Sequence, residues 1–187
     1  MKIHLNTALR ILLATNGLIL VSGAMFGPIY ALFVEKIGGD LLDASYAYAA
    51  FSVSAGTMAI ISGKFADRIK EKELVVVFGY ALMAIGFFSY IFVQSVWHLL
   101  IIQVLIGLGE AIYSPAFDAV YSQHIAKSSS GLQWSFWEAM NYFTMTVGAL
   151  IGGYLTTYFG FNMMFVLMAS LCLISALYIL FLPRKVL

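Results

Sequence analysis

The sequence predicts an all-α membrane protein with six transmembrane helices, arranged as two inverted repeats of three helices. Hydrophobic residues make up 62% of the 187-residue chain, charged residues only 10%, and the mean hydropathy is +0.94. Soluble domains carry about 25% charged residues, so this composition indicates a chain that lies mostly in lipid. The charges that remain are concentrated between apolar runs, as expected for loops between membrane helices.

Six apolar segments define the expected spans. They are residues 11–34, 44–62, 74–93, 99–121, 134–158 and 163–182. Each is near the roughly 20 residues that an α-helix needs to cross the hydrocarbon core. None alternates polar and apolar residues, which argues against a membrane β-barrel. The whole chain, residues 1–187, is therefore expected to form one six-helix transmembrane domain.

The charged loop between the second and third segments sets the expected orientation. Residues 63–73 hold seven of the nineteen Asp, Glu, Lys and Arg residues. Nine of the ten Lys and Arg residues fall on the same side of the membrane as this loop, and Lys36 alone falls on the other. Because positively charged loops stay in the cytoplasm, we expect an integral protein of the plasma membrane with both termini in the cytoplasm.

The two halves of the chain show weak internal similarity. Pro28 of the first segment aligns with Pro115 of the fourth, and both are expected to bend their helices because proline removes a backbone N–H. With three spans in each unit, two copies must have opposite topology in the membrane. The expected repeats are residues 8–93 and 96–182.

A motif in the charged loop resembles the first signature of the major facilitator superfamily, G-x-L-a-D-r-x-G-r-r. It runs from Gly63 through Asp67 and Arg68, but lysine and glutamate stand at the second glycine and at the arginine after it. The resemblance implies a conformational switch in which Asp67 and a loop cation join a carboxylate near the cytoplasmic end of the fourth segment. Asp118 is placed to be that carboxylate. The cation would be one of Arg68, Lys70 and Lys72.

Two glycine-containing motifs resemble further signatures of this family. In the fourth segment, Gln103 precedes a G-x-G step and stands where the signature R-x-x-x-G-x-G has its arginine. In the fifth segment, residues 148–153 are similar to the G-P-x-x-G-G motif of exporters, with alanine at the proline. Glycines let helix backbones approach closely in a membrane. The predicted packing positions are Gly107, Gly109, Gly148, Gly152 and Gly153.

The resemblance covers all six segments, which are half of the family's usual twelve, and implies a major facilitator-type bundle that performs secondary active transport. The first and fourth segments would line the path, the second and fifth would face another half, and the third and sixth would support them from outside. We expect proton-coupled efflux of lipophilic or amphipathic compounds, with uptake of sugars or other small polar solutes as the alternative.

A half of this kind needs a partner for alternating access. The chain is expected to form a homodimer, to pair with a separate six-helix half, or to be the leading half of a longer protein. The lipid bilayer and a small-molecule substrate are the other expected partners. A non-transporting membrane scaffold is the alternative from another class of function.

Polar residues inside the spans are the candidates for the path, because an unpaired charge in hydrocarbon costs at least about 2.5 to 3.5 kcal/mol. Glu110, in the middle of the fourth segment, is the candidate carrier of a coupling proton, and a carboxylate that never titrates is the alternative. For Asn16, bonding between helices is an equal alternative. For Glu138 and Asn141, a position at the membrane interface is an equal alternative to substrate binding, and Trp134 is expected to anchor the fifth segment there. The candidate substrate or proton path comprises Asn16, Gln103, Glu110, Tyr113, Glu138 and Asn141.

Several other activities lack their motifs. The sequence has no G-x-x-x-x-G-K-[ST] run, so ATP hydrolysis is not expected. Its three histidines do not form a metal pair at helical spacing, and no metal or cofactor is expected. The sequence does not suggest a group of Ser, His and Asp side chains at a common membrane depth, so an enzyme is not expected. The net charge of +1 gives no indication of nucleic-acid binding.

Overall fold

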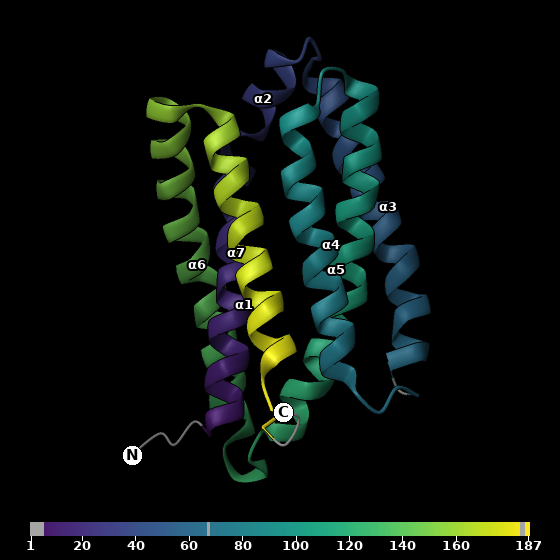
Figure 1. The fold of residues 1–187 in the computed structure, drawn as a ribbon, viewed down its shortest axis with the longest axis vertical. Helices are drawn as coiled ribbons and strands as arrows, with labels where there is room; N and C mark the ends of the chain where they lie inside the picture. The colour runs from purple at the N-terminus through teal and green to yellow at the C-terminus, as the bar shows by residue number, and fades with distance from the viewer. Residues whose placement is uncertain (1–5, 67, 184–185) are drawn as a thin grey trace.

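The computed structural model describes residues 6–66, 68–183 and 186–187, and in this part of the chain every regular element is a helix. The long helices run side by side as a bundle, and α1 begins at the same end of it where α7 ends (Figure 1). The α-helices are α1 (Thr7–Phe26), α2 (Tyr30–Lys36), α3 (Leu41–Ala66), α4 (Lys72–Ser89), α5 (Val96–His124), α6 (Ser130–Phe159) and α7 (Phe161–Phe181). Short 3-10 helices are η1 (Gly27–Ile29), η2 (Tyr90–Phe92) and η3 (Lys127–Ser129).

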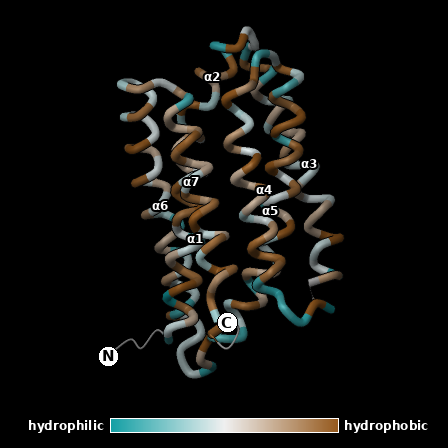
Figure 2. The backbone as a smooth tube through the Cα atoms, viewed as in Figure 1, coloured by the Kyte–Doolittle hydropathy of each residue, from teal (hydrophilic) through white to brown (hydrophobic). Residues whose placement is uncertain are grey.

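Five stretches of the described chain are long and apolar enough to cross a membrane. They are Thr7–Lys36, Leu41–Phe65, Lys72–Phe92, Val96–His124 and Phe161–Phe181. Apolar residues dominate along the helices, while polar residues gather toward the ends of the bundle (Figure 2). These stretches match five of the six predicted spans in length and apolarity.

The sixth predicted span, residues 134–158, lies in α6. This helix has 30 residues and packs along α1, so it is long enough to cross a bilayer. It is absent from the five apolar stretches because its sequence is more polar, with Asn141, Thr144 and Thr146 within two turns. The membrane crossing of α6 therefore stays a prediction.

The first span is broken near one end. The 3-10 helix η1 separates α1 from α2, and Pro28 lies within it. Proline has no N–H to continue the helical hydrogen bonds, which explains why the regular helix stops here. The bend predicted at Pro28 is thus a break between two helices. Pro115, by contrast, lies inside α5, which is one continuous α-helix.

The principal contacts place the helices in the order α6, α1, α7, α4, α5, α3. In this order α1 lies between α6 and α7, α5 lies between α3 and α4, and α4 packs on α7. When α1 is exchanged with α5, α3 with α6, and α4 with α7, the result is the same order of helices read in reverse. The two outermost helices of the order are α3 and α6.

Glycines allow the closest of these contacts. A Cβ at Gly107 of α5 would lie 2.6 Å from the carbonyl oxygen of Phe51 in α3. A Cβ at Gly152 of α6 would overlap the backbone of Met25 in α1. Only a residue without a side chain lets these backbones approach so closely, which brings α5 onto α3 and α6 onto α1.

Serine hydroxyls add hydrogen bonds between neighbouring helices. Ser54 Oγ of α3 donates to the carbonyl oxygen of Val104 in α5 at 2.9 Å. Ser175 Oγ of α7 donates to the carbonyl oxygen of Thr15 in α1 at 3.0 Å, and both of these residues are buried. In lipid such bonds satisfy hydroxyl groups that have no water to bind.

Candidate binding cavity

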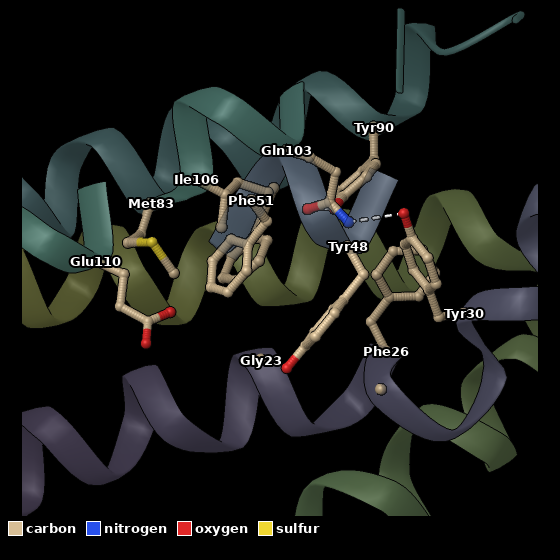
Figure 3. Close-up of a pocket in the computed structure, with 12 residues that line it drawn as sticks. Gly23, Phe26, Tyr30, Tyr48, Phe51, Met83, Tyr90, Gln103, Ile106 and Glu110 are labelled. Atoms are coloured by element: carbon tan, nitrogen blue, oxygen red, sulfur yellow. Dashed lines mark hydrogen bonds between the residues drawn. The ribbon is translucent and has the colours of Figure 1, made fainter. Parts of the chain in front are cut away.

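A cavity of about 270 Å³ lies between α1 and the helices α3, α4 and α5 (Figure 3). Six of its lining residues carry aromatic rings, and Glu110 is the single charged one among those described. Ligand pockets range from about 300 Å³ upward, so this volume suits part or all of a small molecule. The lining residues are Gly23, Phe26, Gly27, Tyr30, Tyr48, Phe51, Met83, Phe87, Tyr90, Gln103, Ile106 and Glu110.

The amide and the carboxylate of the cavity come from one face of α5. Gln103, Ile106 and Glu110 are three and seven positions apart, which is the spacing of residues on one side of an α-helix. At 1.5 Å of rise per residue, Gln103 and Glu110 are separated by about 10 Å along the helix axis. The cavity therefore has an amide near one end and a carboxylate near the other (Figure 3).

The amide of Gln103 is held by two tyrosines. Its Nε2 donates to Tyr30 Oη at 2.7 Å, and its Oε1 accepts from Tyr90 Oη at 3.2 Å. Gln103 is buried, and Tyr30 is the first residue of α2, directly after the break in the first span. These bonds fasten α2 and η2 to α5, and they engage both ends of the amide within the protein.

Glu110 is half-buried, and its carboxylate points from α5 toward α1 beside Met83 (Figure 3). Within the described part of the chain, no side chain donates a hydrogen bond to this carboxylate. An ionisable group without a partner at membrane depth is costly, and it is normally kept for a function. Glu110 is therefore the group in the cavity that is free to bind a proton or a cation.

Two predicted path residues lie outside the cavity lining. Asn16 of α1 is buried, and its Oδ1 accepts a hydrogen bond from Tyr80 Oη of α4 at 3.1 Å. Tyr113 of α5 is buried with its ring 4.9 Å from the ring of Tyr80. Both side chains thus join helices in the packed core, whereas Gln103 and Glu110 come together at the cavity.

The predicted residues of α6 also lie outside the cavity lining. Glu138 is exposed, and Asn141 is half-buried. Trp134, expected to be an interfacial anchor, packs its ring 5.0 Å from that of Tyr121 in α5, because α6 approaches the end of α5 here. The Nε1 of Trp137 is buried and has no hydrogen-bond partner among the described residues.

The predicted conformational switch is only partly described by the structure. Asp67 lies outside the described residues. Arg68 is exposed, Lys72 begins α4, and Asp118 is half-buried in the last turns of α5. Open space surrounds Gly63, since nothing lies within 4 Å of a Cβ built there. The switch therefore stays a prediction.

The glycines of the two helix motifs differ in their surroundings. Gly109 faces Met83 of α4, and Gly148 faces Ala24 of α1, as close helix packing requires. Gly153 has nothing within 4 Å of a Cβ built on it.

Sequence reasoning missed the aromatic walls of the cavity. Tyr48 and Phe51 lie on one face of α3 at a spacing of three, which is a signal that the sequence contains. Phe26 and Tyr30 are four positions apart, but η1 separates α1 from α2 between them, so helical spacing does not place these two rings. The third segment was expected only to support the bundle from outside. Its supporting role stays a prediction, but its helix α4 and η2 also contribute Met83, Phe87 and Tyr90 to the cavity wall.

The fold and the cavity define an α-helical integral membrane protein with a partly open pocket between its helices. The model of the Major Facilitator Superfamily matches residues 12–186, and the chain belongs to this family. Members of the family are transporters and not enzymes.

Relatives of the chain include multidrug resistance proteins. Multidrug resistance protein MdtG of Dickeya zeae (strain Ech586) is 26% identical over 171 residues, which are 89% of this chain and 42% of that protein. The proteins of the same name from Salmonella dublin and Salmonella typhimurium are 23% identical over 171 residues, with the same coverage. The chain thus spans 42% of the length of these relatives.

Proposed function

We propose that this chain is one half of a secondary active transporter that exports small amphipathic molecules in exchange for protons. The observation that carries the proposal is the carboxylate of Glu110 in a cavity with aromatic walls. Aromatic rings bind apolar bodies and attract cations to their faces, and a carboxylate complements a positive charge. A substrate with a flat apolar body and one positive charge fits this lining best. The multidrug resistance relatives are consistent with such a substrate.

Glu110 is the proposed site of proton coupling. In the low-dielectric interior, its carboxylate is stabilised either by a proton or by the charge of a bound cation. Binding of a proton to Glu110 therefore opposes binding of a cationic substrate. This competition is what the exchange of protons for substrate requires. In this proposal the termini lie in the cytoplasm, and the protein resides in the plasma membrane.

Two inverted repeats, residues 8–93 and 96–182, are part of the proposal. The order in which the helices pack supports these repeats. Exchanging α1 with α5, α3 with α6, and α4 with α7 gives the same order read in reverse. Inverted repeats place a binding site near the middle of the membrane, at the interface between the repeats. The cavity lies between α1 and α5, which are the first helices of the two repeats.

The proposed transporter requires a second six-helix half. The outermost helices α3 and α6 expose large apolar side chains, among them Val53, Ile60, Phe143 and Leu150. Because the relatives are more than twice as long as the matched region, a comparable bundle is the natural partner for these faces. That bundle is a second copy of this chain, a separate six-helix half, or another half in the same protein.

Two alternatives fit the cavity less well. Sugar uptake needs several free hydrogen-bonding groups, yet the amide of Gln103 is already engaged by Tyr30 and Tyr90. A scaffold has no use for an unpaired carboxylate in a membrane cavity. Efflux of amphipathic cations is therefore the function that the lining supports best.

The test uses the full chain in proteoliposomes with an imposed proton gradient and tetraphenylphosphonium as the probe cation. We expect gradient-driven accumulation, its loss in Glu110→Gln, and normal transport in Glu35→Gln, which removes an exposed carboxylate of α2. Full transport by Glu110→Gln would refute the coupling role. Absence of transport by the unmodified chain, alone and with its second half, would refute the transporter itself.

A further inference from the structure

A groove of about 440 Å³ runs between α1 and α7 on the side of α1 that faces away from the cavity. Ala14 lines the groove and Gly23 lines the cavity, and they are nine residues apart. Nine residues are two and a half helical turns, so these positions lie on opposite faces of α1. In a membrane-spanning bundle, the groove therefore opens toward lipid or a lipid-facing neighbour.

The floor of the groove is apolar. Ile11 and Leu18 of α1 and Ile174 of α7 contribute aliphatic side chains, and the small side chain of Ala14 leaves room between them. The buried hydroxyls of Ser175 and Thr15 donate to the carbonyl oxygens of Thr15 and Ile11 in α1, so these two polar groups of the floor are paired within the protein. A hydrocarbon chain fits such a surface, and a polar solute does not.

A positive charge stands at the mouth of the groove. Arg10 is exposed in the first turn of α1, and it is the single charged residue among the described lining residues. Tyr178 lies near the end of α7, at the same end of the bundle (Figure 1). Helix ends lie at the depth of the lipid headgroups, where arginine and tyrosine are favoured. From Arg10 to Leu18 the groove extends about 12 Å along α1 into the hydrocarbon.

A second groove provides a comparison within the same molecule. It lies between α3 and α5, has a volume of about 450 Å³, and has no charged residue among its described lining residues. An uncharged groove can hold an acyl chain but has no basis for selecting a headgroup. The α1–α7 groove has a similar volume but also has the guanidinium group of Arg10 among its lining residues. A guanidinium group forms paired hydrogen bonds with phosphate.

We propose that the α1–α7 groove is a binding site for one anionic glycerophospholipid. The phosphate lies against Arg10, and one acyl chain follows the groove toward Leu18. The lipid bridges α1 and α7 and thereby stabilises the bundle. This site lies outside the substrate cavity, so the proposal stands or falls independently of transport.

The first test compares two lipids with identical acyl chains, phosphatidylglycerol and phosphatidylcholine, added to the full chain in dodecylmaltoside. We expect phosphatidylglycerol to raise the Tm at a half-saturating concentration about tenfold lower than phosphatidylcholine. Both lipids carry a phosphate, but the quaternary ammonium of phosphatidylcholine offsets its attraction to Arg10, whereas phosphatidylglycerol keeps a net negative charge. Arg10→Gln should remove this preference. Lys36→Gln, which removes a charge at the opposite end of the first span, should keep it.

The second test counts the phosphatidylglycerol molecules retained per chain by native mass spectrometry. Ala14→Phe fills the groove and should lower the retained number from one to zero, whereas Ala50→Phe in the α3–α5 groove should not. Should Ala14→Phe not fold, Ile174→Phe fills the groove from α7. Equal effects of the two lipids on the unmodified chain, or a preference that survives in Arg10→Gln, would overturn the proposal.

Discussion

Gln103 Nε2 donates a 2.7 Å hydrogen bond to Tyr30 Oη, and this bond joins α5 to the first residue of α2. Because η1 interrupts the first span, side-chain contacts must hold α2 in place. On its other side, Phe33 of α2 packs its ring 5.1 Å from that of Phe165 in α7. One wall of the cavity thus depends on an amide from α5 and an aromatic contact with α7.

Gln103→Leu should destabilise the bundle. The substitution leaves the hydroxyls of Tyr30 and Tyr90 without their partner, and each unsatisfied group costs about 1 to 3 kcal/mol. The measurement is the free energy of unfolding in detergent. Tyr30→Phe removes only one of the two bonds and should cost less. Equal stability of Gln103→Leu and the unmodified chain would contradict this role of the amide.

Gly152→Ala and Gly153→Ala should have very different effects on the stability of the bundle, although the two positions are adjacent. A Cβ at Gly152 overlaps the backbone of Met25, so α6 must move from α1, at a cost of about 1 to 3 kcal/mol. A Cβ at Gly153 meets open space, and alanine there should be neutral or stabilise the helix slightly. Thermal unfolding of the two variants measures the difference, and similar Tm values would argue against the close α1–α6 contact.

The hydrogen bond between Tyr80 and Asn16 should stabilise the bundle and should not be required for transport. A double-mutant cycle with Asn16→Val and Tyr80→Phe should give a coupling energy of about 0.6 kcal/mol, the average for such bonds between membrane helices. Transport by the folded single variants should be retained. A stable Asn16→Val protein without transport would instead place Asn16 on the path.

Cys172 should not react with a water-soluble maleimide in the folded protein. Its side chain is 0% exposed, and a thiol buried among apolar groups is inert. Tyr48→Cys should be labelled, since Tyr48 lines the cavity and is 64% exposed, and a bound substrate should slow the reaction. Mass spectrometry counts the added groups. Labelling of Cys172 before unfolding would show that α7 packs less tightly than described.

The sequence by itself determined the class of protein and most of its helices. Length and apolarity are properties of a segment alone, so the composition and the segments predicted an all-helical membrane bundle. Five of the expected spans are helices that are long and apolar enough to cross a membrane. The motifs around Gly63, Gly107 and Gly148 indicated the family that the match over residues 12–186 establishes. Glu110 was identified as a candidate because a charge within an apolar run is conspicuous without any knowledge of its neighbours.

The tertiary structure decided which side chains meet. In a soluble helix, polar and apolar faces reveal the inward side, but in lipid both faces are apolar, so the sequence does not state how each helix is rotated. Packing alone turned Asn16 and Tyr113 toward α4 and turned Gln103 and Glu110 toward the cavity. The same packing brought Phe87 of α4 and Tyr90 of η2 into the cavity wall, because close contacts at glycines fix the helices laterally and about their axes.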